Sequence, residues 1–227
     1  MTGRARALSH EEILTKLKEA VIGMDADGAR IAAEGALRSG LDPVDAIVRG
    51  LSEGMRTVGD RFGKMEIFLS EVLASADAYY AALEVLKPKL GKERAKRAFI
   101  ATMVIGTIFG DIHTVGKEVA IPVFESAGFN VIDLGIDVPP EGFVEAAIRN
   151  GAELVGLGTY MSETFFHVPD VVKAFERAGI REKVKIICGG PAVDPGAARK
   201  LGADDASSDA WEAVGKLKRL LEELRGK

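Results

Sequence analysis

The chain has 227 residues, which is enough for one large domain or two modest ones, and 47% of them are hydrophobic, which can supply real cores. No apolar stretch reaches the length of a membrane span, and residues 1–7 are basic but lack the apolar core of a secretory signal, so we expect a cytoplasmic protein without a membrane partner. A net charge of −4 gives no reason to expect nucleic acid as the main partner.

Four amphipathic helices are predicted before residue 91. The first begins at a capping box that starts with Ser9, and the second begins at Asp25, whose carboxylate can accept from free N–H groups of the first turn. The third is predicted as one helix over residues 43–63, with a proline at its first position, and the fourth covers residues 69–86. Helices joined by such short turns predict an antiparallel four-helix bundle over residues 1–90.

A basic segment follows the bundle. Residues 87–97 hold six basic side chains, a proline and a glycine, and they interrupt the helical periodicity. A charge run between two folded units is usually solvated, so we interpret the segment as a connector. The predicted domains are then a helical domain, residues 1–90, and a second domain, residues 91–227.

The second domain alternates strands and helices, which is typical of a parallel sheet. Cys188, the single cysteine, lies in an apolar strand pattern and is interpreted as a buried structural thiol. The order of elements fits a flavodoxin-like (Rossmann-type), doubly wound domain with five parallel strands and helices on both faces. Strands are expected at about residues 98–105, 130–134, 154–159, 185–188 and near 205, and helices at about residues 115–127, 140–150, 165–178, 195–201 and 209–224.

The loop after the first strand carries the most informative residues, Gly110-Asp111-Ile112-His113-Thr114-Val115-Gly116. Open α/β sheets hold ligands at this edge because the loops there diverge. A carboxylate and an imidazole two residues apart suit a metal ligand and its supporting partner, with Asp111 accepting one ring N–H of His113 and the other nitrogen binding the metal. The alternative is an ordinary loop in which Asp111 caps the next helix and His113 is polar surface.

The motif Asp111-x-His113-x-x-Gly116 resembles the signature of the cobalamin-binding domain shared by methionine synthase, the B12-dependent mutases and the corrinoid proteins of methyltransferase systems. The resemblance implies a cobalamin or corrinoid cofactor of the methylcobalamin type, with His113 replacing its benzimidazole as the lower axial ligand to cobalt. The displaced nucleotide tail would thread into the domain beside the sheet. Asp111 would steady the imidazole when His113 leaves and rejoins the cobalt.

The resemblance extends to the ends of the later strands. The turn at residues 133–140, the Gly189-Gly190 pair after the fourth strand and the loop at residues 202–210 are all like those of the corrinoid proteins. The cofactor contacts that it implies in this domain are Gly110, Asp111, Ile112, His113, Thr114, Val115, Gly116, Gly158, Thr159, Tyr160, Ser162, Gly189, Gly190 and Ser208.

One departure from the family pattern follows the third strand. Where the family usually has Ser and then Leu two residues later, this chain has Gly158 and Tyr160, so the hydroxyl that would assist the Asp–His pair is missing. We expect Thr159 or Ser162 to substitute. The departure affects the tuning of the axial ligand and the hold on the nucleotide rather than binding itself.

The helical domain carries a resemblance of its own. Residues 54–62 and 68–76 resemble the four-helix cap of methionine synthase and of the methylamine and methanol corrinoid proteins. The resemblance implies that Phe68, Leu69 and Val72 cover the upper corrin face and keep water and oxygen from the cobalt. The alternative is that these side chains are ordinary bundle core.

The function implied is methyl carriage by a subunit that is not a stand-alone catalyst. A substrate-specific methyltransferase would load the methyl group, an acceptor methyltransferase would pass it to tetrahydrofolate or a thiol, and a reductive activator would keep the cobalt active. Substrate recognition would belong to the partner enzyme, so methylamines, methanol, betaine-like compounds and aryl methyl ethers all stay open as donors. The connector, residues 87–97, would be the hinge about which the cap opens.

Three alternatives stay open. A cobalamin-dependent sensor or regulatory module could share both domains, although it would normally carry a DNA-binding segment and the first helix here is expected to start near residue 9. An adenosylcobalamin isomerase subunit would need a catalytic barrel that a chain of 227 residues cannot also contain. The third alternative is a flavodoxin-like module without cobalt.

Overall fold

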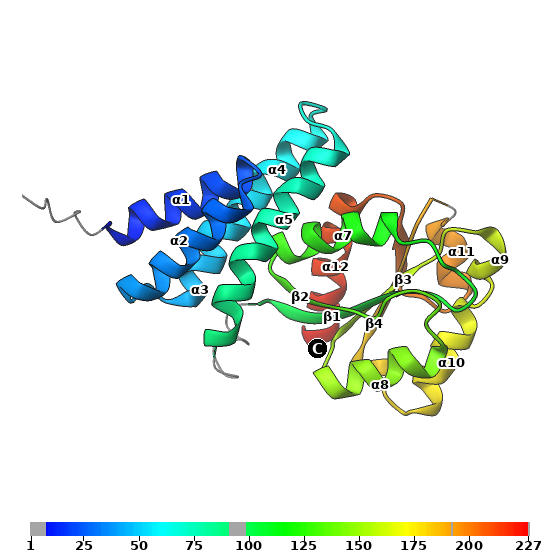
Figure 1. The fold of residues 1–227 in the computed structure, drawn as a ribbon. Coiled ribbons are helices and arrows are strands. Elements are labelled where there is room, and N and C mark those ends of the chain that lie inside the picture. Colours follow the sequence, from blue (N-terminus) through cyan, green and yellow to red (C-terminus); the bar gives the residue numbers. More distant parts are fainter. Residues whose placement is uncertain (1–7, 91–98, 192, 227) are drawn as a thin grey trace, which may run out of the picture. The chain divides into compact units, whose positions relative to one another are not determined.

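The computed structural model describes residues 8–90, 99–191 and 193–226, which divide into two compact units. The first unit holds the residues up to Phe99 and is helical, whereas the second holds nearly all residues from Ile100 onward and contains the sheet (Figure 1). Of the predicted connector, residues 87–90 are described, and its remainder, with the predicted boundary between residues 90 and 91, lies outside the described residues.

The helical unit is a four-helix bundle, as predicted. Helix α1 contacts α2 and α4, and α5 contacts the same two helices, so the four close around one core. Fully buried Leu17, Ala33, Leu51 and Tyr79 lie in that core. The elements are α1 (His10–Ile22), α2 (Ala26–Ser39), α3 (Pro43–Asp45), the π-helical segment η1 (Ala46–Ser52), α4 (Glu53–Gly63), α5 (Leu69–Leu86) and the 3₁₀ turn η2 (Lys87–Lys89). Within the described part of the chain, no helix combines the length and apolarity needed to cross a membrane.

The starts of α1 and α2 are fixed by the side chains that the sequence identifies. The Ser9 hydroxyl accepts from the Glu12 N–H at 3.3 Å, and the Glu12 carboxylate accepts from the Ser9 N–H at 2.7 Å, which completes the capping box. The Asp25 carboxylate accepts from the Gly28 N–H at 2.8 Å. Both caps satisfy N–H groups that have no partner inside the helix.

The third predicted helix is not uniform. Residues 43–63 form α3, then π-helical η1, then α4, and not one continuous α-helix. The apolar spacing could not reveal this, because a short π segment leaves similar side chains on the same face. Two glycines of this run lie against α1, since a Cβ added to Gly50 would lie 3.0 Å from Leu17 and one added to Gly54 would lie 2.8 Å from Val21.

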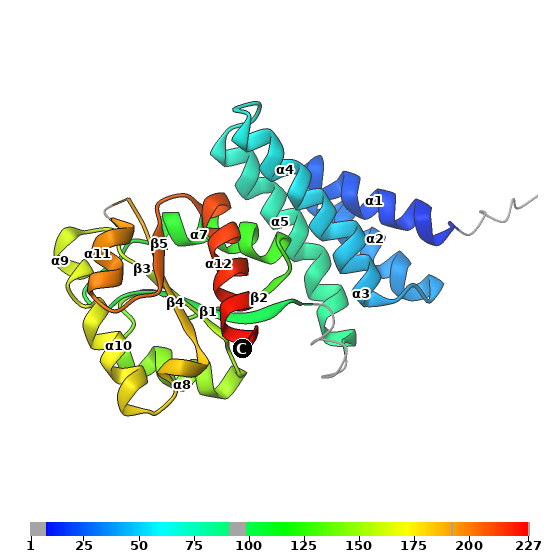
Figure 2. The same ribbon diagram turned by 180° about the vertical axis from the view of Figure 1, so that it is seen from behind.

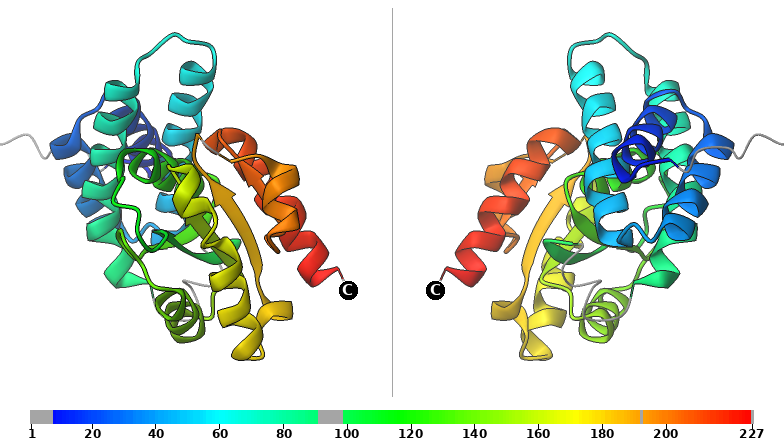
Figure 3. Two further views of the ribbon diagram at one scale, coloured as in Figure 1. Left: turned by 90° about the vertical axis from the view of Figure 1, so that its right-hand side faces the viewer. Right: turned by 90° about the vertical axis from the view of Figure 1, so that its left-hand side faces the viewer.

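The second unit is a five-stranded parallel sheet with the strand order β2-β1-β3-β4-β5, which confirms the predicted fold. Helices α7 and α12 cover one face, and α8 and α10 cover the other (Figures 1 and 2). Figure 3 shows β4 between α10 and α12. The strands are β1 (Ala101–Thr107), β2 (Phe129–Asp133), β3 (Leu154–Gly158), β4 (Lys185–Gly189) and β5 (Asp205–Ser207), and the helical elements are α7 (Val115–Ser126), α8 (Pro140–Asn150), α9 (Ser162–Phe165), α10 (Val168–Arg177), η3 (Arg181–Lys183), α11 (Pro195–Lys200) and α12 (Ala210–Arg225).

Two boundaries in this unit differ from the prediction. The helix expected at residues 165–178 is two helices, α9 and α10, because Pro169 has no N–H to continue a helix and sits instead in the first turn of a new one. Strand β1 continues to Thr107, which is fully buried and pairs with Gly158. The prediction ended that strand at residue 105, because a buried threonine does not extend an apolar pattern.

Candidate functional site

The turn after β1 determines where the site lies. The Asp111 N–H donates to the Ile108 carbonyl at 3.0 Å and closes a four-residue turn. Gly110, at the third position, has a φ of +82°, the left-handed value that a type II turn requires and that glycine adopts readily. Because Thr107 at the end of β1 pairs with Gly158 at the end of β3, the turn lies at the carboxyl edge of the sheet.

Asp111 is fully buried beneath this turn and accepts hydrogen bonds on both oxygens. Its Oδ1 accepts from the backbone N–H of His113 at 3.1 Å and lies 2.7 Å from that residue's Nδ1. Its Oδ2 accepts from the Tyr160 N–H at 2.9 Å and from the Thr164 hydroxyl at 2.8 Å. Burial raises the pKa of Asp111, but these hydrogen bonds outweigh burial and hold the pKa below its usual value. Asp111 is therefore an anionic carboxylate.

The His113 imidazole has one committed nitrogen and one available nitrogen. An ionised carboxylate only accepts, so Nδ1 carries the proton in the 2.7 Å contact with Asp111 and Nε2 of the neutral ring presents its lone pair. Among the described residues no hydrogen bond to Nε2 is present, and the side chain is 53% exposed. A carboxylate that fixes the tautomer of an outward-facing imidazole is the arrangement of a metal ligand.

Thr164 supplies a hydroxyl to the Asp–His pair, in place of the serine that the family usually has at the position of Gly158. It lies on α9, its side chain is buried, and it donates to Asp111. The expectation that Thr159 or Ser162 would take this role is wrong: the Thr159 hydroxyl lies 3.4 Å from the Gly189 carbonyl, and Ser162 is exposed at the start of α9. The short helix α9 turns the residue six positions after Gly158 back toward the carboxylate, which strand spacing does not reveal.

Tyr160 lies beside the imidazole. Its ring centroid is 5.6 Å from that of His113, with 35° between the ring planes. A Cβ added to Gly116 would lie 2.5 Å from the Tyr160 ring, so the glycine of the motif makes room for this ring. Burial, followed by the charge of Asp111, raises the pKa of Tyr160 to about 12, which keeps the phenol neutral.

Large apolar side chains stand exposed on the loops that bring these groups together. Phe109 (49% exposed) and Ile112 (70%) belong to the loop after β1, Ile136 (41%) to the loop after β2, and Phe166 (71%) to the segment after α9. Exposed apolar residues concentrated on neighbouring loops indicate a binding surface rather than ordinary protein surface. The ligand that it favours has a broad apolar face.

The ends of β3 and β4 approach each other closely. The Thr159 N–H donates to the Gly189 carbonyl at 2.8 Å. Gly190 has a φ of +135°, and a Cβ there would lie 2.0 Å from the Thr159 carbonyl oxygen, so only glycine fits. A Cβ on Gly189 would instead meet only Ser207, at 3.9 Å. The backbone at Gly189 is thus open to a slender group, and exposed Ser208 follows on the next strand.

The loop after β2 holds the turn after β1 from the other side. The Gly110 N–H donates to Asp137 Oδ1 at 2.7 Å, and the Asp137 N–H donates to the Asp111 carbonyl at 3.0 Å. The Thr107 hydroxyl donates to the His113 carbonyl at 2.8 Å. The sequence analysis did not single out Asp137 as a site residue, although the turn that contains it was one of the matching segments.

The remaining predicted contacts are placed as follows. Thr114 and exposed Val115 complete the loop at the start of α7. In the helical unit, Phe68 is 81% exposed directly before α5, Leu69 is half-buried, and Val72 is fully buried. Val72 is therefore not accessible, and Phe68 is the member of that group with an exposed apolar side chain. Cys188 is buried, as predicted, and burial raises its pKa to about 12, so it is not a nucleophile.

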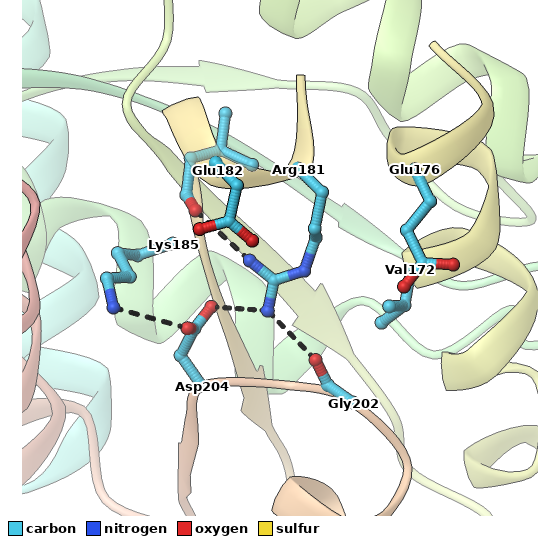
Figure 4. Close-up of a pocket in the computed structure, with 8 residues that line it drawn as sticks. Val172, Glu176, Arg181, Glu182, Lys185, Gly202 and Asp204 are labelled. Atoms are coloured by element: carbon cyan, nitrogen blue, oxygen red, sulfur yellow. Dashed lines mark hydrogen bonds and ion pairs between the residues drawn. The ribbon is translucent and has the colours of Figure 1, made fainter. Parts of the chain in front are cut away.

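A pocket of about 260 Å³ lies at the opposite, amino edge of the sheet (Figure 4). Arg181 crosses it and donates to the Gly202 carbonyl and to Asp204, both at 2.9 Å, and Lys185 lies 3.4 Å from the same carboxylate. The Asp204 carboxylate also accepts from the Ile186 N–H at 2.7 Å. These charges and hydrogen-bonding groups pair with one another. We therefore interpret the pocket as a structural contact between η3 and the loop before β5.

The residues at the carboxyl edge fit a metal that is already coordinated by a flat macrocycle. Such a metal already has its equatorial ligands and needs one more, which the Nε2 of His113 can provide, while the exposed apolar side chains suit the face of the ring. The open backbone at Gly189 suits a slender nucleotide tail. The residues present therefore fit a corrinoid, and His113 would be the residue to bind its cobalt.

Comparison with known proteins gives the family. Residues 101–214 match the family described as B12 binding domain, and residues 13–87 match a second family of the same description. Trimethylamine corrinoid protein 2 of Methanosarcina acetivorans is 41% identical over 208 residues, which cover 92% of this chain and 96% of the relative. Dimethylamine corrinoid protein 1 of the same organism is 39% identical over 214 residues, covering 94% of this chain and all of the relative.

The fold is shared with solved structures. The crystal structure of the methanol:cobalamin methyltransferase complex MtaBC from Methanosarcina barkeri contains a chain that matches with a TM-score of 0.82 and 25% identity, over 98% of this chain and 87% of that one. Both domains thus have counterparts in cobalamin-binding proteins. The chain belongs to the B12-binding corrinoid proteins, and its cofactor is a corrinoid that contains cobalt.

Proposed function

We propose that this chain carries a methyl group on corrinoid cobalt between two methyltransferases, one that takes the group from a methylated amine and one that passes it to tetrahydrofolate or a thiol. The observation that carries the proposal is the Asp111–His113 pair at the sheet edge, in which the imidazole is half-exposed and its Nε2 has no hydrogen-bond partner among the described residues. The similarity to trimethylamine and dimethylamine corrinoid proteins supports amines over the other donors. A reductive activator is the third partner.

In this proposal the residues of this chain would hold the cofactor, and His113 would bind its cobalt. When bound, the corrinoid supplies cobalt chemistry that accepts and releases the methyl group. His113 ligates through Nε2, while Asp111 keeps the proton on Nδ1 and prevents the ring from flipping. Thr164 and the Tyr160 N–H hold Asp111 in turn.

The helical unit is proposed to cover the opposite corrin face. Phe68 and Leu69 are the side chains proposed for contact, because Phe68 presents a large apolar face that the bundle does not use. Such a cover keeps water and oxygen from the reactive side of the cofactor. Phe68→Ala should then speed the reoxidation of reduced protein-bound cobalamin by oxygen several-fold, with Ile31→Ala, another exposed apolar residue of the bundle, as the control.

The ligand assignment is tested by loading the full chain with hydroxocobalamin and desalting it. The wild type should stay coloured at one corrinoid per chain with a histidine-ligated spectrum, and His113→Ala should lose that spectrum. The matched control is His167→Ala, because His167 is also partly exposed near this surface but pairs with Asp170 at 3.1 Å. An unchanged spectrum in His113→Ala would defeat the assignment.

The methyl source is tested with separate methyltransferases. Loaded, reduced protein should gain a methyl group from trimethylamine or dimethylamine when the corresponding amine methyltransferase is added, and not from methanol with a methanol-specific enzyme. Methylation in the methanol reaction alone would overturn the amine assignment and leave the carrier role standing. No observation favours the sensor or regulatory alternative.

A further inference from the structure

We propose that Asp137 is a positioning residue for the axial histidine, acting through the turn that carries Asp111 and His113. The inference rests on the proposed function, in which His113 ligates the corrinoid cobalt. Asp137 itself comes from a different loop, the one after β2. Its contribution would be to set the orientation of the imidazole rather than to touch the metal.

Two hydrogen bonds make Asp137 a clamp on the turn. Its Oδ1 accepts from the Gly110 N–H at 2.7 Å, and its own N–H donates to the Asp111 carbonyl at 3.0 Å. The Gly110 N–H lies at the third position of the turn, whose own closing bond uses a different N–H, so the Asp137 side chain gives it a partner. The clamp therefore grips the two residues directly before the Ile112–His113 segment.

The backbone of Asp137 supports a dedicated role. Its φ is +52°, a left-handed value that costs energy for a residue with a Cβ and that aspartate and asparagine tolerate best. The residue is exposed, so core packing does not impose this conformation. Its neighbour Val138 is buried and donates to the Thr107 carbonyl at 2.9 Å, which anchors the loop beside β1. Strain at an exposed residue that bonds twice to a ligand-bearing turn points to positioning.

The expected consequence is specific to ligation. Without the carboxylate acceptor, the Gly110 N–H turns to water and the turn samples more orientations. The imidazole then meets the cobalt correctly in a smaller fraction of molecules. We expect the ratio of histidine-off to histidine-on cobalamin to rise about five- to tenfold, the factor that the loss of one hydrogen bond produces.

Three variants separate the carboxylate from the backbone. Asp137→Gly removes the acceptor and accepts the positive φ without strain, so it should fold as well as the wild type. Asp137→Asn keeps an oxygen acceptor and should restore ligation. The matched control is Asp25→Gly in the helical unit, which removes a carboxylate bond of similar length, 2.8 Å to the Gly28 N–H.

The readout is the electron paramagnetic resonance spectrum of the full chain loaded with hydroxocobalamin and reduced to the Co(II) state. A ligated histidine splits each cobalt line into three through its nitrogen, and labelling with ¹⁵N-histidine turns the three into two. Asp137→Gly should show a smaller share of this split signal than the wild type, by the shift of about five- to tenfold in the ratio given above, whereas Asp137→Asn and Asp25→Gly should match the wild type.

The outcomes distinguish this inference from the proposed function. Full nitrogen splitting in Asp137→Gly, beside a wild type that also shows it, would overturn the role of Asp137 alone. Absence of splitting in the wild type would overturn the ligation by His113 itself. Equal loss in Asp137→Gly and Asp137→Asn would also contradict the inference, because the asparagine keeps the acceptor.

Discussion

The two edges of the sheet use charged residues in opposite ways. At the amino edge, the side chains of Arg181, Lys185 and Asp204 are each less than a fifth exposed. They line a pocket, and both cations form ion pairs with the carboxylate. At the carboxyl edge, by contrast, the Nε2 of His113 has no hydrogen-bond partner among the described residues, and several large apolar side chains are exposed. An available ligand nitrogen and exposed apolar side chains therefore mark the candidate binding site.

The strongest test of the difference between the two edges is to place a cysteine at each edge and measure how fast each is labelled. The native Cys188 should react very slowly, because a buried thiol with a pKa of about 12 is almost entirely protonated at pH 8. Its labelling should become faster only as the pH approaches 12. Ile112→Cys at the carboxyl edge and Glu182→Cys at the amino edge are both exposed. We expect each to react with iodoacetamide at least about a hundredfold faster than Cys188.

Corrinoid should then separate the two edges. Loading with hydroxocobalamin should slow labelling of Ile112→Cys about tenfold or more and leave Glu182→Cys unchanged, as measured by mass spectrometry. Protection at Glu182→Cys instead would move the site to the amino edge and reverse the comparison.

The next effect concerns stability. Asp204→Ala should lower the free energy of unfolding of the sheet unit by about 2–4 kcal/mol, because it removes the carboxylate that Arg181, Lys185 and the Ile186 N–H share. Corrinoid affinity, measured well below the unfolding transition, should stay within about twofold of the wild type. Glu182→Ala, which lines the same pocket, should change stability by less than about 0.5 kcal/mol in urea unfolding.

The contacts at the carboxyl edge differ in how far the sequence could predict them. Asp111 and His113 are two residues apart on one loop, so their pairing could be predicted from spacing, and the parallel sheet of five strands could be predicted from the alternation of elements. Thr164 on α9 reaches Asp111 over a separation of 53 residues, and Asp137 in the loop after β2 reaches Gly110 over 27. Such contacts exist only once the strands are in register, so local patterns do not contain them.

A third prediction tests the hydroxyl that the sequence analysis misplaced. Thr164→Val keeps the shape and removes the donor to Asp111, so the free energy of unfolding should fall by about 1–2 kcal/mol and the histidine-on fraction of bound cobalamin should also fall. Thr164→Ser should keep both near wild type. Thr159→Val serves as the control, because its hydroxyl faces the Gly189 carbonyl and not Asp111. A larger loss of ligation in Thr159→Val than in Thr164→Val would restore the original expectation.

The smallest expected effect is a coupling between Gly116 and Tyr160. Gly116→Ala forces a methyl group against the Tyr160 ring, where the contact would be 2.5 Å, and should cost about 1–3 kcal/mol of stability. Tyr160→Leu removes the ring and makes room, so the double variant should be about 1 kcal/mol more stable than the sum of the single effects predicts, as measured by a double-mutant cycle in urea. Simple additivity would contradict the inference that Gly116 makes room for the Tyr160 ring. If Gly116 instead makes room for the cofactor, Gly116→Ala should lower the measured affinity for corrinoid whether or not Tyr160 is present.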